Sequence, residues 1–178
     1  MNDISLVPLN HDDAEELFEF ELRHRAYFER WINARSPDFY HIDAVRQSIA
    51  ESLRNRERDL AYNYLIKEAG RIVGRINLTE VARRYYNKAL LGYRVAEDVG
   101  GRGIASRAVA LVLEEAFQQL GLWRIEATVR DGNTGSARVL QKNGFTEFGR
   151  SRQSMFLNDA WHDLLYFECR GPVASAAN

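Results

Sequence analysis

The segment from Leu90 to Leu120 constrains the fold more than any other, because it joins a strand, a glycine-rich turn and a helix. Branched and aromatic residues predict a β-strand at Leu90–Val95. The turn reads Gly100-Gly101-Arg102-Gly103-Ile104-Ala105-Ser106. Beyond it, apolar residues recur with the spacing of one helix face, namely Ala105, Val109, Val112, Leu113, Ala116, Phe117 and Leu120. Gly121 then provides a typical helix end.

A glycine-rich turn of this kind suits an anion. Glycine lets the backbone approach a ligand without a Cβ atom in the way. The first amides of a helix lack intrahelical acceptors, and the helix dipole adds positive charge there, so phosphate or pyrophosphate is a natural ligand. Arg102 would add a full charge. A simple strand–helix connection explains the same glycines, so this element alone leaves both interpretations open. No lysine follows these glycines, which excludes a P-loop.

Composition narrows the class of protein. The 178 residues include 24 Lys and Arg against 25 Asp and Glu, so no global charge favours nucleic acid or membranes as partners. The single cysteine, Cys169, excludes an intrachain disulfide and a cysteine-built metal site. No apolar run reaches transmembrane length and the acidic N-terminus does not resemble a signal peptide, so we expect a cytoplasmic protein.

Periodicity along the rest of the chain predicts alternating helices and strands in a single domain, residues 1–170, followed by a flexible tail, 171–178. We expect strands at Ile4–Leu9, Leu60–Lys67, Arg71–Val81, Leu90–Ala96, Trp123–Arg130, from Phe145, and at Trp161–Cys169. Further helices are expected from Asn10, at Ile42–Leu53 and at Thr134–Asn143. The aromatic residues Tyr27, Phe28 and Trp31 either pack between two helices or line a substrate cleft.

Glu80 stands out in the second hairpin. It shares one face of its strand with Ile72, Gly74, Ile76 and Leu78, so it ends an apolar file. Such a carboxylate is either partly buried and functional or solvated at the end of the strand. A bulge would also move it to the other face.

A second motif follows at Asn133-Thr-Gly-Ser136-Ala-Arg-Val139-Leu140-Gln-Lys142-Asn-Gly144-Phe145. With the Gly100–Ala105 turn it resembles the two signatures of GNAT acetyltransferases, Gln/Arg-x-x-Gly-x-Gly/Ala and Asn-x-x-Ala/Ser-x-x-Val/Leu…Gly-Phe. Gly100 stands at the first position of the first signature, where those enzymes have Gln or Arg. The chain is most similar to the Rim-type branch, which acetylates N-terminal amines of ribosomal proteins, as supported by the segments 74–78, 91–93 and 161–163.

The resemblance implies an α/β (α+β) GNAT fold. Its central sheet is mixed, mostly antiparallel and of about seven strands, with about four to five flanking helices and a splay between the fourth and fifth strands. It also implies acetyl-CoA as co-substrate and no metal.

The resemblance further implies roles for individual residues. The amides of Gly101, Arg102, Gly103, Ile104, Ala105 and Ser106 would hold the pyrophosphate. The backbone at Arg94 and Val95 would pair with the pantetheine arm, which Asn133 would also contact, and an amide near Val95 would polarise the thioester carbonyl. Leu140 replaces the tyrosine that many members use toward the leaving thiolate, and Ser136 is the substitute. Glu80 is the predicted base, with Glu126 and His162 as alternatives.

The expected function is therefore acetyl transfer to a primary amine, at a protein or peptide N-terminus of ribosomal-protein type. A small-molecule acceptor, such as an aminoglycoside, a polyamine or an amino acid, and a non-catalytic acyl-CoA-binding module are the alternatives. The sequence is compatible with a monomer or a homodimer.

Overall fold

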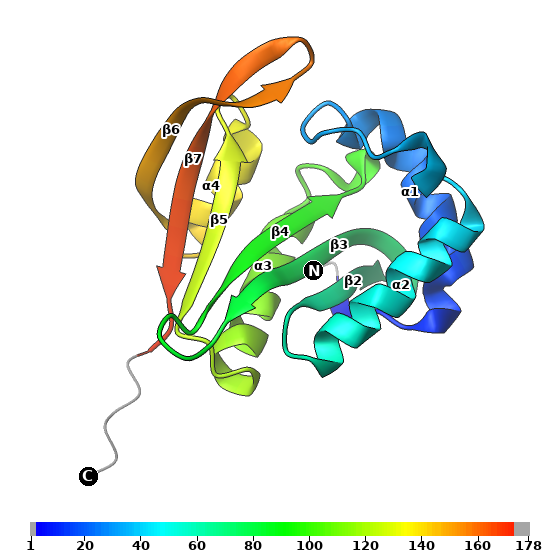
Figure 1. The fold of residues 1–178 in the computed structure, drawn as a ribbon, viewed down its shortest axis with the longest axis horizontal. Coiled ribbons are helices and arrows are strands. Elements are labelled where there is room, and N and C mark those ends of the chain that lie inside the picture. Colours follow the sequence, from blue (N-terminus) through cyan, green and yellow to red (C-terminus); the bar gives the residue numbers. More distant parts are fainter. Residues whose placement is uncertain (1–2, 173–178) are drawn as a thin grey trace.

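A computed structural model describes residues 3–172 and contains a seven-stranded sheet with helices on both faces (Figure 1). The strands are β1 (Ile4–Pro8), β2 (Tyr62–Glu68), β3 (Arg71–Ala82), β4 (Lys88–Val95), β5 (Arg124–Arg130), β6 (Thr146–Leu157) and β7 (Ala160–Arg170). The main helices are α1 (Ala14–Phe28), α2 (Ile42–Glu57), α3 (Ile104–Glu114) and α4 (Thr134–Lys142). The predicted fold class is confirmed. Most of the expected tail, residues 173–178, lies outside the described residues.

The sheet is antiparallel except at its centre. Its strand order is β1-β2-β3-β4-β5-β7-β6, and only β4 and β5 run parallel. Their pairing extends from Lys88 opposite Arg124 to Leu91 opposite Ala127 and then ends. The last four residues of β4 therefore have no partner on the β5 side, and the two strands diverge there (Figure 1). This opening, called the splay below, is where the family resemblance placed it.

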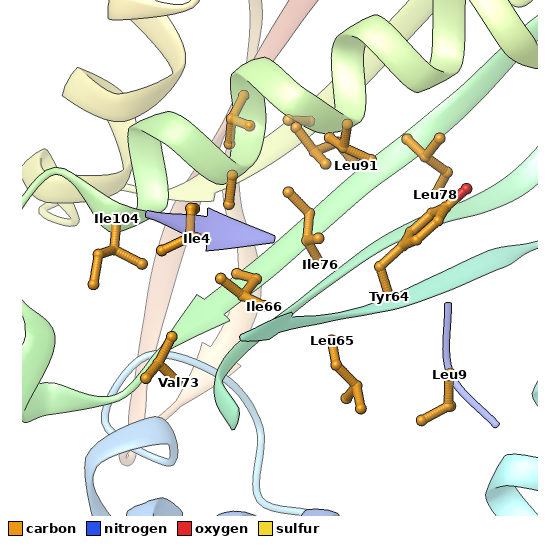
Figure 2. Packing of buried hydrophobic residues seen from close by; sticks show 14 of the residues in the cluster. Ile4, Leu9, Tyr64, Leu65, Ile66, Val73, Ile76, Leu78, Leu91 and Ile104 are labelled. Carbon is orange, nitrogen blue, oxygen red and sulfur yellow. The ribbon is translucent and has the colours of Figure 1, made fainter. Parts of the chain in front are cut away.

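Both faces of the sheet are covered. Leu65 and Ile66 are consecutive residues of β2 and both are fully buried, which requires packing on each side because successive side chains alternate. Figure 2 shows Ile66, Ile76 and Leu91 on the side of α3, and Leu65 on the opposite side. The helices α1 and α2 cover that opposite side (Figure 1). The splay is thus bordered by α3 and α4 on one face and by α1 on the other.

The apolar face predicted for α3 is confirmed. Ala108, Val109 and Val112 have no measurable exposure, and they fix the helix against the sheet so that its first turn lies next to the splay. Within residues 3–172, no helix combines the length and apolar character needed to cross a membrane.

Candidate active site

A cavity of about 720 Å³ occupies the splay. Its walls come from the end of α1 and the loop after it, from β3, β4 and β5, from the turn before α3, and from α4. A cavity of this volume is in the range of small-molecule sites. Its lining residues come from both faces of the sheet.

The glycine turn forms one end of this cavity. Gly101 and Gly103 adopt left-handed backbone conformations, with φ of 74° and 80°, and Gly103 precedes the first residue of α3. A Cβ atom at either glycine would meet no atom within 4 Å, so the space in front of the turn is open. Gly101, Gly103, Ile104, Ala105 and Ser106 all line the cavity. The first amides of α3 therefore border the cavity, and their binding of an anion stays a prediction.

Arg102 differs from its neighbours in the turn. Its guanidinium donates to Glu68 Oε1 at 2.7 Å, and the residue is not part of the cavity wall. The side chain would have to leave Glu68 to reach a phosphate group. Its predicted part in pyrophosphate binding stays a prediction.

The β4 edge and the start of α4 form the adjoining walls. Arg94 and Val95 line the cavity where β4 has lost its partner, so their backbone groups can pair with an extended ligand. Asn133 also lines the cavity and caps α4, its side-chain oxygen accepting a hydrogen bond from the Ser136 amide at 3.1 Å. Contact of these residues with pantetheine stays a prediction.

Ser136 has a partner that the sequence analysis missed. The hydroxyls of Tyr93 on β4 and Ser136 on α4 are 2.9 Å apart, and the Tyr93 hydroxyl also lies 3.1 Å from the Ser136 carbonyl oxygen. Burial raises the pKa of Tyr93 to about 12, although the hydrogen bond with Ser136 opposes this shift. Tyr93 therefore stays protonated near neutral pH and can support Ser136 as a proton donor. Leu140 lines the same wall and is fully buried.

Of the alternatives for Glu80, the structure shows the solvated side chain and not the partly buried one. The register between β3 and β4 shifts between Thr79 and Ala82, and Glu80 takes a φ of 52° inside this irregularity. The bulge turns the side chain out of the apolar file, so Glu80 is exposed and is not part of the cavity wall. Its role as base stays a prediction.

The two alternative bases also lie outside the wall. Glu126 is held by Lys88 at 2.9 Å and by Arg124 at 2.8 Å. His162 Nε2 lies 3.0 Å from the Leu157 carbonyl oxygen and 3.4 Å from Arg130 Nη1.

A buried ion cluster near the cavity also escaped the sequence analysis. Glu21 of α1, only 1% exposed, accepts hydrogen bonds from Arg75 of β3 at 2.8 Å and from Arg94 of β4 at 2.9 Å. Burial acts to raise the pKa of Glu21, but the nearby guanidinium groups outweigh it and hold that pKa below its ordinary value. Burial lowers the pKa of Arg94 to about 9, with Glu21 opposing. A glutamate on the apolar face of α1 was the available signal for this cluster.

Comparison with known proteins identifies the family. Residues 3–146 match the family model described as an acetyltransferase (GNAT) domain. The chain belongs to the GNAT acetyltransferase family. Within residues 3–172, no group of three or more His, Cys, Asp or Glu side chains could hold a metal ion.

Individual relatives agree with this assignment. The chain is 36% identical over 162 residues to the probable N-acetyltransferase YjcK of Bacillus subtilis, covering 90% of each chain. It is 30% identical over 172 residues to the putative ribosomal N-acetyltransferase YdaF of the same organism, covering 92% of this chain and 89% of the relative. The structure of Mycobacterium smegmatis RimJ in complex with a CoA disulfide matches with a TM-score of 0.87 and 27% identity, covering 94% and 81% of the two chains. The chain is thus a GNAT-family N-acetyltransferase with Rim-type relatives.

Proposed function

We propose that this enzyme acetylates the α-amine of a peptide or protein N-terminus, with acetyl-CoA as donor. One observation carries the proposal: a single cavity extends through the splay, from the Gly100–Ser106 turn on one face to Phe28 and Arg94 on the other. Acetyl-CoA would enter from the side of α3 and α4, and the acceptor from the side of α1. The two would meet where β4 and β5 part.

For the donor, the turn would bind the pyrophosphate through the amides of Gly101–Ser106. Arg138 and Lys142 of α4 line the cavity and would add positive charge near the phosphates. The pantetheine arm would extend β4 as an additional strand at Arg94 and Val95 and contact Asn133. An amide near Val95 would then donate to the thioester oxygen as negative charge develops there. Coenzyme A in the related RimJ structure supports this choice of donor.

The reaction would proceed by direct attack. The amine nitrogen bonds to the thioester carbon, the carbon–sulfur bond breaks, and sulfur leaves with the bonding electron pair. Ser136 would donate its hydroxyl proton toward the thiolate, and the Tyr93 hydroxyl, 2.9 Å away, would turn its own proton from the Ser136 carbonyl oxygen to the Ser136 hydroxyl.

The amine must lose a proton before it attacks. Arg75, Arg94 and Arg35 all line the cavity, and Glu21 supplies one compensating carboxylate. Excess positive charge disfavours an ammonium ion and so lowers the pKa of a bound amine. To be deprotonated at neutral pH, an α-amine with a pKa of about 8 needs a much smaller decrease in pKa than a lysine side chain with a pKa of about 10.4. The same positive charge disfavours the binding of polyamines, which are themselves cations. Glu80, next to the cavity-lining Thr79, stays the predicted final acceptor of the proton.

Release of free thiol from acetyl-CoA tests this function. A peptide with a free N-terminus should support release of the thiol. The same peptide with a blocked N-terminus should not, and neither should spermidine. The ribosomal description of YdaF favours peptides of ribosomal-protein type as the first panel. Turnover with spermidine and none with any peptide would overturn the proposal.

A further inference from the structure

The acceptor side of the cavity has a wall of unusual polarity. Four of its residues, here called the acceptor wall, are Arg35 in the loop after α1, Arg75 and Asn77 on β3, and Arg94 on β4. Arg75 is paired with Arg94 across the two strands, and Asn77 is paired with Gly92. Residues two apart on a strand point to the same face, so Asn77 and the two arginines face α1 together.

The charges of the acceptor wall do not cancel. Glu21 is shared by Arg75 and Arg94, so one carboxylate faces two guanidinium groups. Arg35 adds a third cation, which stacks on the Phe39 ring with its central carbon 3.9 Å from the ring centre. Within residues 3–172 the Arg35 guanidinium makes no hydrogen bond or ion pair. Glu29, at the end of α1, is held by Arg25 and Tyr40. An excess of two positive charges therefore faces the cavity.

Asn77 adds an independent sign of a ligand. Its side-chain oxygen is buried and has no hydrogen-bond partner within the described residues. An unpaired buried acceptor costs about 1–3 kcal/mol, and most such groups in native proteins are satisfied. Because Asn77 lines the cavity, a rotation of its side chain would present this oxygen to an N–H donor on the acceptor, such as a backbone amide of an extended peptide.

The spacing between these two features defines a substrate. Asn77 is two strand positions from Arg75, which corresponds to roughly 7 Å at about 3.4 Å per residue. An extended peptide whose first amine lies beside the thioester near Val95, and whose backbone continues toward Asn77, passes the arginines and can place the side chain of its second or third residue beside them. We propose that the acceptor wall is an anion subsite, with Arg35 as its free cation, that selects N-terminal peptides carrying an acidic side chain at the second or third position. This inference rests on the proposed function.

Matched peptides test the subsite. One peptide begins Ser-Asp, and its control begins Ser-Asn and is otherwise identical, so only a charge differs. We expect kcat/KM to be at least about tenfold higher for the Asp peptide, with the difference mainly in KM. Arg35→Gln should abolish the preference, and Arg35→Lys should restore part of it. Arg23→Gln removes the same charge from the exposed side of α1 and should leave the preference intact. Asn77→Leu should lower kcat/KM for both peptides alike.

The outcomes separate the two proposals. Equal kcat/KM for the two peptides would overturn the subsite and leave N-terminal acetylation standing. A preference lost equally in Arg35→Gln and Arg23→Gln would also overturn it, because the effect would then be long-range. If no peptide is acetylated, the proposed function fails. Calorimetric binding of both peptides to the enzyme–CoA complex then decides the subsite alone: tighter binding of the Asp peptide supports it, and equal binding overturns it.

Discussion

Replacing Gly103 with alanine should weaken acetyl-CoA binding far more than its effect on folding explains. Gly103 has a φ of 80°, and an added Cβ would meet no protein atom within 4 Å. The folding cost is therefore limited to backbone strain, about 1–2 kcal/mol for a non-glycine residue in this conformation. With ligand bound, however, the same methyl group would face the pyrophosphate oxygens.

The loss of affinity follows from the hydrogen bonds at stake. An amide bonded to a charged oxygen contributes about 1.5–3 kcal/mol. Displacing the pyrophosphate from one such amide should raise the Kd about ten- to hundredfold, since 1.4 kcal/mol is tenfold. Titration calorimetry with acetyl-CoA measures this change directly, and urea denaturation measures the folding cost separately.

Gly70 provides a matched control. It lies in the turn between β2 and β3, has the same φ of 80°, and an added Cβ there would also meet no atom within 4 Å. Gly70→Ala should lose similar stability and bind acetyl-CoA with unchanged affinity. Unchanged affinity in a folded Gly103→Ala variant, or equal losses of affinity in both variants, would show that this turn does not bind the pyrophosphate.

Three further predictions concern the walls of the cavity. Glu21 has a folded-state pKa below its ordinary value of 4.5, so its stabilisation is complete above that pH and is lost as pH falls through the folded pKa. Glu21→Gln should thus lower the free energy of unfolding by about 3–5 kcal/mol at neutral pH. Urea titrations should show the difference in unfolding free energy between wild type and variant becoming smaller below pH 4.5, and a difference that stays constant contradicts this. Ser136→Ala should lower kcat by roughly tenfold to a thousandfold with acetyl-CoA affinity retained, and Tyr93→Phe should add little in the double variant because the two hydroxyls act together; a wild-type kcat in Ser136→Ala would rule this out. Glu80→Gln should lower kcat by at most about tenfold, since the side chain is exposed, and the loss should shrink from pH 7 to pH 9.5 as the amine deprotonates unaided; a loss that stays constant would exclude a role as base.

Features encoded by neighbouring residues were predictable from the sequence. The turn before α3 could be located because two glycines with positive φ mark it, and the helix because its apolar spacing is regular. The start of α4 was predictable for the same reason. Asn133 is a typical helix-capping residue, and its side chain accepts a hydrogen bond from the amide of Ser136, three residues later. These segments border the splay, whose position was implied by the resemblance to GNAT enzymes.

Features that depend on packing between distant segments were not predictable. Glu21 is 54 residues from Arg75 and 73 from Arg94, and only the docking of α1 on β3 and β4 brings them together. Tyr93 and Ser136 are 43 residues apart and belong to a strand and a helix. The outward turn of Glu80 reflects the pairing of Ala82 with Lys88, which alternation along a single strand does not specify. The position of the Arg102 side chain similarly depends on its ion pair with Glu68 of β2, which is distant in the sequence.

The most direct test of N-terminal acetylation locates the transferred acetyl group. A peptide with a free N-terminus and an internal lysine is incubated with the enzyme and acetyl-CoA, and fragment mass spectrometry assigns the modified amine. We expect acetylation of the α-amine, with the lysine unmodified. Acetylation of the lysine, or none of either amine while a small-molecule amine is consumed, would contradict it.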